Sequence, residues 1–398
     1  MKVLLLHQHF NTPQKGGPLR SYYLVRALAD RGIRAIIVTA YNGSKYKVEV
    51  VEGLEVHYLP VGYHNSFGFY KRTKSFLKYM VRAVSLTRKF TDISLCYAIS
   101  VPLTVGVAAI AIKALYRIPY IFEVGDLWPE APIQMGFVRN KHLIKTLYRI
   151  EKYIYKNAMC VVALSHPIRE SIEEKLPGLK VHVVENMSDI QFFVPQPKDP
   201  DTEKKFGFEG KFVVSYIGTL GYANGLEHFI ECALQAASSS LPVHFVLCGD
   251  GAMLPQLKEI AELKKLMNLS IIPFQNRQGV RELLSVTDAT FISYRAVPIL
   301  QTGSPNKFFD GLAAGKLIII NFDGWIKEEV MNNECGIYID REGENEFADK
   351  IKPFLRDPGL LSIYQRNARL LAERKYDRVS LGKRFASIVE NRSWRRRD

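Results

Sequence analysis

Short apolar runs alternate with amphipathic segments along most of this chain, and the alternation begins twice. Val3–Leu6 is the first apolar run of one series, and Phe212–Ile217 opens a second series. Between the two series, Gln196–Glu209 is rich in Pro, Lys, Asp and Glu, which is typical of a linker. Short strands that alternate with helices indicate parallel sheets covered by helices on both faces. The sequence therefore predicts an α/β protein with two doubly wound, Rossmann-like domains facing each other across a cleft.

The segment 302–316 carries a pattern that suggests a ligand. Ser304 suits a helix N-cap, and Pro305 suits the first helical position. Lys307 then places a cation at the positive end of the helix dipole, which is unfavourable unless an anion binds there. Asp310 lies one turn later on the same side, where a carboxylate is suited to accept from sugar or ribose hydroxyls. The alternative is a solvated Lys307 and an ordinary surface Asp310.

A Gly16-Gly17 pair precedes the first predicted helix, directly after the first strand and its polar loop. Glycines at this place let the backbone approach a ligand closely, and the helix start favours an anion. The alternative is a plain tight turn. The GxGxxG fingerprint is absent, so a nicotinamide-dependent dehydrogenase loses its main support.

Two carboxylates lie at the end of another predicted strand, 120–124. Glu123 belongs to the strand itself, and Asp126 lies in the loop that follows it. Because α/β enzymes place ligands at the carboxyl ends of parallel strands, both are candidate catalytic residues. The alternative for Asp126 is that it caps the following turn.

Positive charge is concentrated in the first half of the chain. The net charge is +14, and residues 1–200 carry 27 Lys and Arg against 15 Asp and Glu. Within Phe67–Phe90, aromatic residues are interleaved with basic ones, and no acidic residue occurs between Glu55 and Asp92. A basic, aromatic, amphipathic helix favours an anionic membrane surface. Nucleic acid and simple packing with a solvated basic face are the alternatives. The candidate membrane residues are Lys71, Arg72, Lys74, Lys78 and Arg82.

Residues 93–112 form an uncharged stretch of twenty residues, long enough to span a bilayer. Its Ser, Thr, Pro and Gly residues favour a strand over 93–99, a turn, and a buried helix from about Leu103. The five cysteines form no CxxC pair, and the first residues show no signal-peptide pattern. We therefore expect reduced thiols and a cytoplasmic location.

Several motifs, taken in their order along the chain, carry a family resemblance. The chain resembles GT-B glycosyltransferases of family 4, especially bacterial enzymes that build O-antigen or capsule, including N-acetylfucosaminyl transferases. The motifs are Gly16-Gly17-Pro18, Ala27–Gly32, Phe122–Glu130, Tyr216–Gly221 with Gly225-Leu226-Glu227, Cys248–Gly251 and Ser304–Asp310.

The resemblance implies a GT-B fold and retaining transfer from a nucleotide-diphosphate sugar, often UDP-linked, without a metal or other cofactor. Glu123, Asp126 and Lys307 would be catalytic, with Lys307 paired to the pyrophosphate and Asp310 to the ribose. The donor site would comprise Gly16, Gly17, Gly218, Thr302, Gly303, Ser304, Asn306, Lys307 and Asp310.

The resemblance also implies a lipid-linked saccharide acceptor and a place in lipopolysaccharide or capsule synthesis. The enzyme would be peripheral on the inner face of the cytoplasmic membrane, with no nucleic acid and no obligate protein partner. We expect an acceptor-side domain in residues 1–195, a nucleotide-sugar domain in 205–372, and a C-terminal helix within 373–398 that packs back on the first domain.

The chain departs from the family at three places. Thr302 and Asp310 stand where two glutamates are usual, and Gly125 stands where relatives have Arg or His. The loop that begins at Gly218 lacks the usual Arg and Lys. Two alternatives therefore stay open: a GT-B enzyme of another class, such as a nucleotide-sugar epimerase, and a non-catalytic membrane-binding module.

Overall fold

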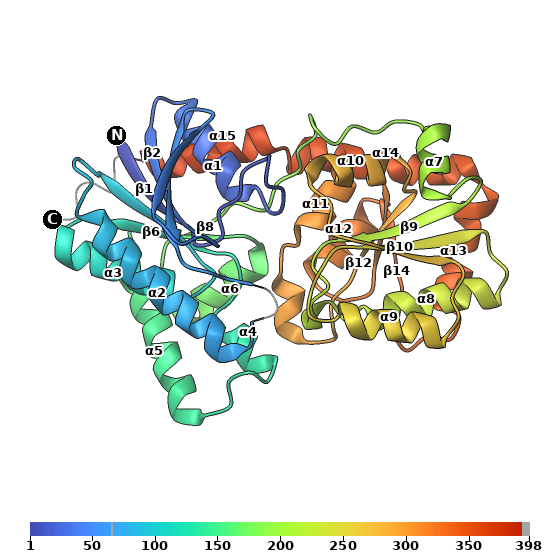
Figure 1. Ribbon diagram of the computed structural model, residues 1–398, viewed down its shortest axis with the longest axis horizontal. Coiled ribbons are helices and arrows are strands. Elements are labelled where there is room, and N and C mark those ends of the chain that lie inside the picture. The colour runs from blue at the N-terminus through green and yellow to red at the C-terminus, as the bar shows by residue number, and fades with distance from the viewer. Residues whose placement is uncertain (65–66, 392–398) are drawn as a thin grey trace.

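A computed structural model describes residues 1–64 and 67–391, and within them the chain forms one sheet of eight strands and one of six. Neighbouring strands are parallel throughout both sheets except for β3 and β4, an antiparallel pair at one edge (Figure 1). The predicted pair of parallel α/β domains is confirmed.

The first sheet has the order β3-β4-β2-β1-β5-β6-β7-β8. Its strands are β1 (Lys2–Leu6), β2 (Arg34–Tyr41), β3 (Lys47–Val51), β4 (Leu54–Pro60), β5 (Leu95–Ile99), β6 (Tyr120–Val124), β7 (Val161–Ala163) and β8 (Val181–Val183). The helices between them are α1 (Arg20–Ala29), α2 (Phe69–Thr87), α3 (Thr104–Tyr116), α4 (Glu130–Gln134), α5 (Lys141–Asn157) and α6 (His166–Lys175).

The second sheet has the order β11-β10-β9-β12-β13-β14. Its strands are β9 (Phe212–Ile217), β10 (Val243–Cys248), β11 (Leu269–Ile272), β12 (Ala289–Ile292), β13 (Leu317–Ile320) and β14 (Gly336–Tyr338). The helices of this half are α7 (Pro200–Phe206), η1 (Tyr222–Asn224), α8 (Glu227–Ser238), α9 (Leu254–Leu263), α10 (Arg277–Ser285), η2 (Pro298–Thr302), α11 (Asn306–Ala313), α12 (Trp325–Asn332), α13 (Glu346–Arg356), α14 (Pro358–Lys375) and α15 (Arg378–Glu390).

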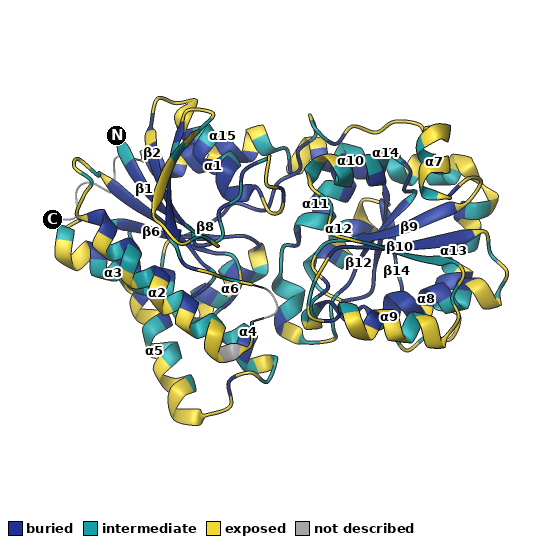
Figure 2. Cartoon of the chain, in the orientation of Figure 1, coloured by how far each residue is buried: buried dark blue, intermediate teal, exposed yellow. Residues whose placement is uncertain are grey.

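Each sheet is buried between two layers of helices, whose outer surfaces are exposed (Figure 2). In the first domain, α2, α3, α5 and α6 close one face of the sheet, with buried side chains such as Tyr79 and Ile154. Helices α1 and α15 close the other face, with Leu24 and Phe385. The second domain has apolar clusters of its own, and Ile299 of η2 also packs into the core of the first domain.

Helix α15 lies at the far end of the chain but packs on the first domain, beside α1 (Figure 1). The two helices approach so closely that a Cβ atom at Gly382 would be 2.9 Å from the Cβ of Ala27. Residues 392–398, at the end of the segment expected to pack there, lie outside the described residues.

The structure tests three local predictions, which concern a helix cap, a linker and an uncharged stretch. The expected Ser304 cap is wrong, because α11 begins at Asn306 after Pro305 and no side chain caps it. The expected linker 196–209 contains α7, which Asp199 caps through the backbone N–H of Thr202 at 2.9 Å. The uncharged stretch 93–112 forms β5 and most of α3, as predicted.

No helix within the described residues is long and apolar enough to cross a membrane.

Candidate active site

Loops that follow strands of both sheets meet at the junction between the domains. After β7, Ser165 donates from Oγ to the carbonyl oxygen of Thr302 at 2.7 Å. After β8, Asn186 donates from Nδ2 to the carbonyl oxygen of Ser304 at 2.8 Å and to Oδ1 of Asn306 at 2.9 Å. Parallel α/β proteins bind ligands at this edge of the sheet. The junction is therefore the candidate active site.

Lys307 lies in the first turn of α11 and extends toward the loop after β9. A Cβ atom at Gly218 would be 3.1 Å from Cε of Lys307, so these two predicted donor residues are neighbours. The Lys307 ammonium also lies 4.7 Å from the ring centroid of Tyr216. Burial lowers the pKa of Lys307 to about 8, against the opposing charge of Asp310. The ammonium is therefore charged at neutral pH, although it is partly desolvated.

Asp310 follows Lys307 by one turn and is half-buried at the same junction. Burial raises the pKa of Asp310 to about 7; the Arg277 cation opposes that rise, the Asp189 carboxylate adds to it, and Lys307 opposes it. A carboxyl group with this pKa changes charge near neutral pH. In its ionised form it is suited to accept hydrogen bonds from a pair of sugar hydroxyls.

The Gly16-Gly17 loop of the first domain reaches the second domain. Both glycines have positive φ angles, of 72° and 81°. A Cβ atom at Gly16 would be 3.4 Å from the backbone nitrogen of Arg277, the first residue of α10. The structure thus brings Gly16 close to a helix N-terminus of the opposite domain, where free N–H groups favour an anion.

The residues just before α11 mostly bond across the junction or within their own segment. Thr302 donates from Oγ1 to the carbonyl oxygen of Ile299 at 2.8 Å, within η2. The carbonyl oxygen of Gly303 accepts from Nε1 of Trp325 at 2.9 Å. The buried Oγ of Ser304 has no hydrogen-bond partner among the described residues. Of these expected donor residues, Ser304 alone presents an unpaired polar side-chain atom there.

The structure corrects the expected catalytic role of Glu123. Its side chain is completely buried and accepts from Nε and Nη2 of Arg20 at 2.9 and 3.0 Å and from the hydroxyl of Tyr97 at 2.5 Å. Arg20 also donates to the carbonyl oxygens of Val184 and Glu185. With both carboxylate oxygens engaged away from solvent, Glu123 fixes Arg20 and does not reach a substrate. The physical reason is that side chains of a strand alternate between the two faces of the sheet, and Glu123 lies on the face covered by α1.

Asp126 occupies a different position from Glu123. Asp126 is exposed in the loop after β6. Desolvation by the protein groups around it still raises the pKa of its carboxyl group. Across the junction, burial and the negative charge of Asp126 together raise the pKa of Tyr294. Asp126 thus faces the second domain, and Tyr294, which follows β12, is a junction residue that the sequence did not indicate.

The sequence also gave no indication of two histidines that lie at the carboxyl end of β1. His7 and His9 follow β1; burial lowers their pKa values to about 3 and 4, so both imidazoles are neutral at physiological pH. The Nδ1 atom of His7 and the Oγ of Ser21 are 2.8 Å apart. Their position directly after an apolar strand was the available signal. No group of three or more His, Cys, Asp or Glu side chains suited to a metal occurs in the described part of the chain.

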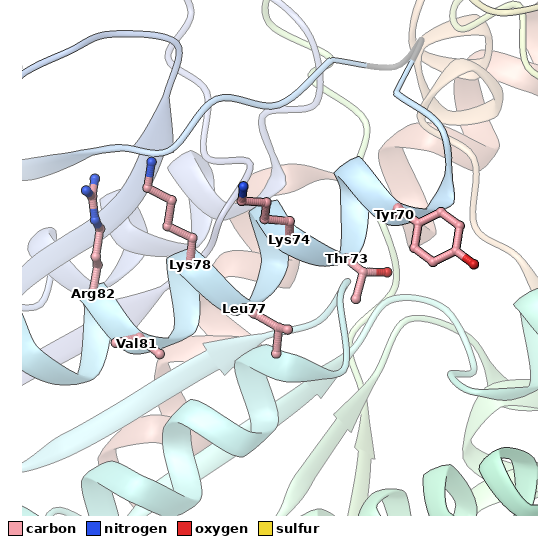
Figure 3. A pocket seen from close by; sticks show the side chains of 7 residues that line it. All are labelled: Tyr70, Thr73, Lys74, Leu77, Lys78, Val81 and Arg82. Atoms are coloured by element: carbon pink, nitrogen blue, oxygen red, sulfur yellow. The ribbon is translucent and has the colours of Figure 1, made fainter.

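The lysines of α2 lie on the outer surface of the first domain, whereas Ser75 on the inner side of this helix accepts from Nε2 of Gln8, in the loop after β1, at 3.2 Å. A pocket lies along this helix, and Figure 3 shows the side chains that line it: Tyr70, Thr73, Lys74, Leu77, Lys78, Val81 and Arg82. The side chains of Tyr70, Leu77 and Val81 are 86%, 47% and 61% exposed. In Figure 3, Lys74, Lys78 and Arg82 extend to one side of the helix, and Leu77 and Val81 extend to the other side.

The five predicted membrane residues divide into two groups. Lys71, Lys74 and Lys78 are exposed. The half-buried Arg72 and Arg82 donate to the carbonyl oxygens of Phe67 and Pro60 at 2.7 and 2.6 Å. The exposed lysines are thus the ones available to an external anion.

Comparison with known proteins agrees with this geometry. Residues 16–187 match the glycosyl transferase 4-like domain, and residues 198–371 match the glycosyl transferases group 1 domain. The chain consists of two glycosyltransferase domains. The boundary between the two matches falls in residues 188–197, which precede α7 in the segment that connects the two sheets.

Two relatives of this chain illustrate the range of the similarity. An alpha-D-kanosaminyltransferase of Streptomyces kanamyceticus is 23% identical over 252 residues, which cover 60% of this chain and 62% of that protein. The glycosyl transferase WcaI of Escherichia coli (strain K12), named for colanic acid biosynthesis, is 25% identical over 185 residues, which cover 46% and 44%. The chain thus matches about three fifths or less of the length of these relatives.

Solved structures match over nearly the whole chain. Sucrose-phosphate synthase from Thermosynechococcus elongatus superposes with a TM-score of 0.77 at 15% identity, over 98% of both chains. Anabaena HepE, solved in complex with UDP and glucose, gives 0.71 at 17% identity, over 98% of this chain and 100% of that one. At these identities the similarity concerns the fold, and it confirms the predicted GT-B architecture of this chain.

Proposed function

We propose that this glycosyltransferase moves a sugar from a UDP-linked donor, with an N-acetylated amino sugar as the transferred group, to a lipid-linked saccharide in bacterial surface polysaccharide synthesis. The observation that carries the donor assignment is the convergence of Lys307, Gly218 and the first turn of α11 at one point of the domain junction. An ammonium beside a helix N-terminus is an arrangement suited to a diphosphate.

In this proposal the chain acts mainly by stabilising charge. The bond between the anomeric carbon and the diphosphate oxygen breaks, and the acceptor hydroxyl oxygen bonds to the same carbon with retention of configuration. The proton of that hydroxyl passes to the departing diphosphate oxygen. Lys307 and the N–H groups of α11 neutralise the departing diphosphate. They thereby take the role that a metal ion has in other transferases. Asp310 accepts from the ribose hydroxyls, and Asp126 contacts the acceptor from the first domain.

The polysaccharide assignment is supported by the relative named for colanic acid biosynthesis. The nucleotide assignment is supported by the fold shared with HepE, which was solved with UDP and glucose. We propose that α2 and the exposed basic side chains of α5 hold the enzyme on the inner face of the cytoplasmic membrane, where a lipid-linked acceptor is found. Charge of this sign attracts anionic lipid headgroups.

Thermal unfolding with UDP, GDP and ADP tests the donor proposal, because a ligand that binds the native state raises the midpoint. We expect a clear increase with UDP that is lost in Lys307→Gln. Lys264→Gln, at the end of α9, is the matched control and should retain the increase. No increase with any of the three diphosphates in the wild-type protein would refute the donor site. Conversion of a UDP-sugar without any acceptor would indicate an epimerase instead.

A further inference from the structure

Asp189 joins three parts of the molecule within the segment that leads out of the first domain. Its carboxylate accepts from the hydroxyl of Tyr23 in α1 at 2.6 Å and from Nε of Arg378 at the start of α15 at 2.7 Å. It also forms an ion pair with Arg277, the first residue of α10 in the second domain. Asp189 is only 5% exposed. One buried carboxylate thus connects both domains and the crossing helix.

Arg277 is held on two sides. Its guanidinium carbon lies 3.7 Å from the ring centroid of Phe192, in the same connecting segment as Asp189. Burial works against ionisation of Asp189, but hydrogen bonds from Tyr23 and Arg277 keep the pKa of that carboxyl below its usual value. The pair is therefore ionised at neutral pH, and breaking it would leave a buried charge without its partner.

Arg277 also adjoins the proposed donor site. Its backbone nitrogen faces Gly16, whose Cβ position would lie 3.4 Å away. The Arg277 cation lowers the pKa of Asp310, and so does Lys307 from the same helix as Asp310. Asp189, from the connecting segment, raises that pKa. A movement of α10 away from Asp189 would therefore change both the approach of the Gly16 loop and the charge around Asp310.

We propose that Arg277 is a positioning residue that couples the closed arrangement of the two domains to the donor site, through its ion pair with Asp189 and its contact with the Gly16 loop. This inference rests on the proposed donor role of Gly16 and Asp310. Without the Arg277 cation, the domains separate more readily, UDP binds more weakly, and Asp310 ionises at a higher pH.

Two readouts test the inference, and one of them needs no nucleotide. Spin labels on Leu115→Cys in α3 and Met267→Cys after α9, which are 66% and 90% exposed in the native chain, report the distance between the domains. The five native cysteines are all buried and do not compete for the label. The second readout is UDP affinity measured as a function of pH in the full chain.

For Arg277→Gln we expect a broader distribution of distances between the two labels, centred on a longer distance, and at least tenfold weaker UDP binding. The acid limb, which is the rise of UDP affinity with pH as Asp310 ionises, should move to higher pH. Arg281→Gln is the matched control, because Arg281 lies one turn further along α10 and also stacks on Phe192, at 4.9 Å. It should behave as wild type. Arg277→Lys, which keeps the charge, should restore the acid limb and supplies a folded comparison should Arg277→Gln not fold.

An unchanged distance distribution and an unchanged acid limb in Arg277→Gln, with wild-type UDP affinity, would overturn the inference while leaving the donor proposal intact. Absence of UDP binding in the wild-type chain would overturn the donor proposal and, with it, the coupling. The distance measurement would then still show whether Arg277 holds the domains together.

Discussion

The ammonium of Lys307 lies 4.7 Å from the ring centroid of Tyr216, at the end of β9 and beside Gly218. The ring face attracts the cation electrostatically, so a lysine that is partly removed from water retains its charge. The same geometry directs the ammonium from the first turn of α11 toward the loop after β9. We therefore expect the affinity for the donor to depend on the charge states of Lys307 and Asp310.

UDP affinity should be highest between about pH 7 and about pH 8. Asp310 becomes a carboxylate as the pH rises through about 7, and Lys307 loses its proton as the pH rises through about 8. Calorimetric titration across this range should show two limbs. Asp310→Asn should remove the acid limb, and Lys307→Arg should extend the alkaline one, because an arginine does not titrate there. A flat wild-type profile would contradict the prediction.

Asp310 should also make the free energy of unfolding depend on pH. Because its pKa is raised in the folded protein, its contribution to stability is fully present below the unfolded value of 3.8 and is lost as the pH rises through about 7. Asp310→Asn should therefore gain stability relative to wild type between these values. The gain has an upper limit of about 4 kcal/mol, at about 1.4 kcal/mol per pKa unit. Urea unfolding at about pH 4 and about pH 8 measures it, with the exposed Asp250→Asn as a control that should show no such trend.

Gly16→Ala should weaken donor binding more than it destabilises the fold. Gly16 has φ +72° and faces Arg277, whereas Gly32, at the end of α1, has φ +70° with no atom within 4 Å of its Cβ position. Both substitutions incur a similar backbone cost of about 1 kcal/mol. Only Gly16→Ala places a methyl group where the loop meets α10, so only it should raise the Kd for UDP. Equal Kd values for the two variants would contradict a role for Gly16 in the donor site.

Glu123→Gln should lower stability while leaving the folded enzyme active. Glu123 is fully buried against Arg20, and loss of one partner of such a pair costs about 3–5 kcal/mol. Glu173→Gln, which breaks the exposed pair with Arg169 on α6, should cost less than about 1 kcal/mol. Urea unfolding gives both values. A tenfold or larger fall in kcat for Glu123→Gln without a loss of stability would restore its expected catalytic role.

Binding to anionic vesicles should depend on the exposed face of α2. Each lysine near a charged membrane contributes about 1 kcal/mol, so the double variant Lys74→Gln, Lys78→Gln should bind phosphatidylglycerol vesicles about thirtyfold more weakly. Leu77→Glu should weaken binding further through loss of apolar insertion. Leu263→Glu, on the exposed surface of α9 in the other domain, is the control. Equal vesicle sedimentation of all variants would exclude α2 as the contact surface.

The alternation of apolar runs was sufficient to predict two parallel α/β domains, because buried strands and amphipathic helices leave local signals in the sequence. The same kind of signal led from 93–112 to β5 and α3. Local reasoning was less reliable at helix ends. It placed a cap at Ser304, whereas the structure leaves that Oγ buried and unpaired, since the segment is held instead by Asn186 and Ser165 from the other domain.

The sequence by itself determined the fold class, the Gly16-Gly17 loop and the unusual position of Lys307 and Asp310, because each depends on neighbours close in the chain. The tertiary structure decided which carboxylates can reach a ligand. It buried Glu123 beneath Arg20, exposed Asp126 opposite Tyr294, and brought Asp189 and Arg277 together from segments 88 positions apart. Burial and electrostatic pairing arise only when distant segments fold together, so no local pattern carries them.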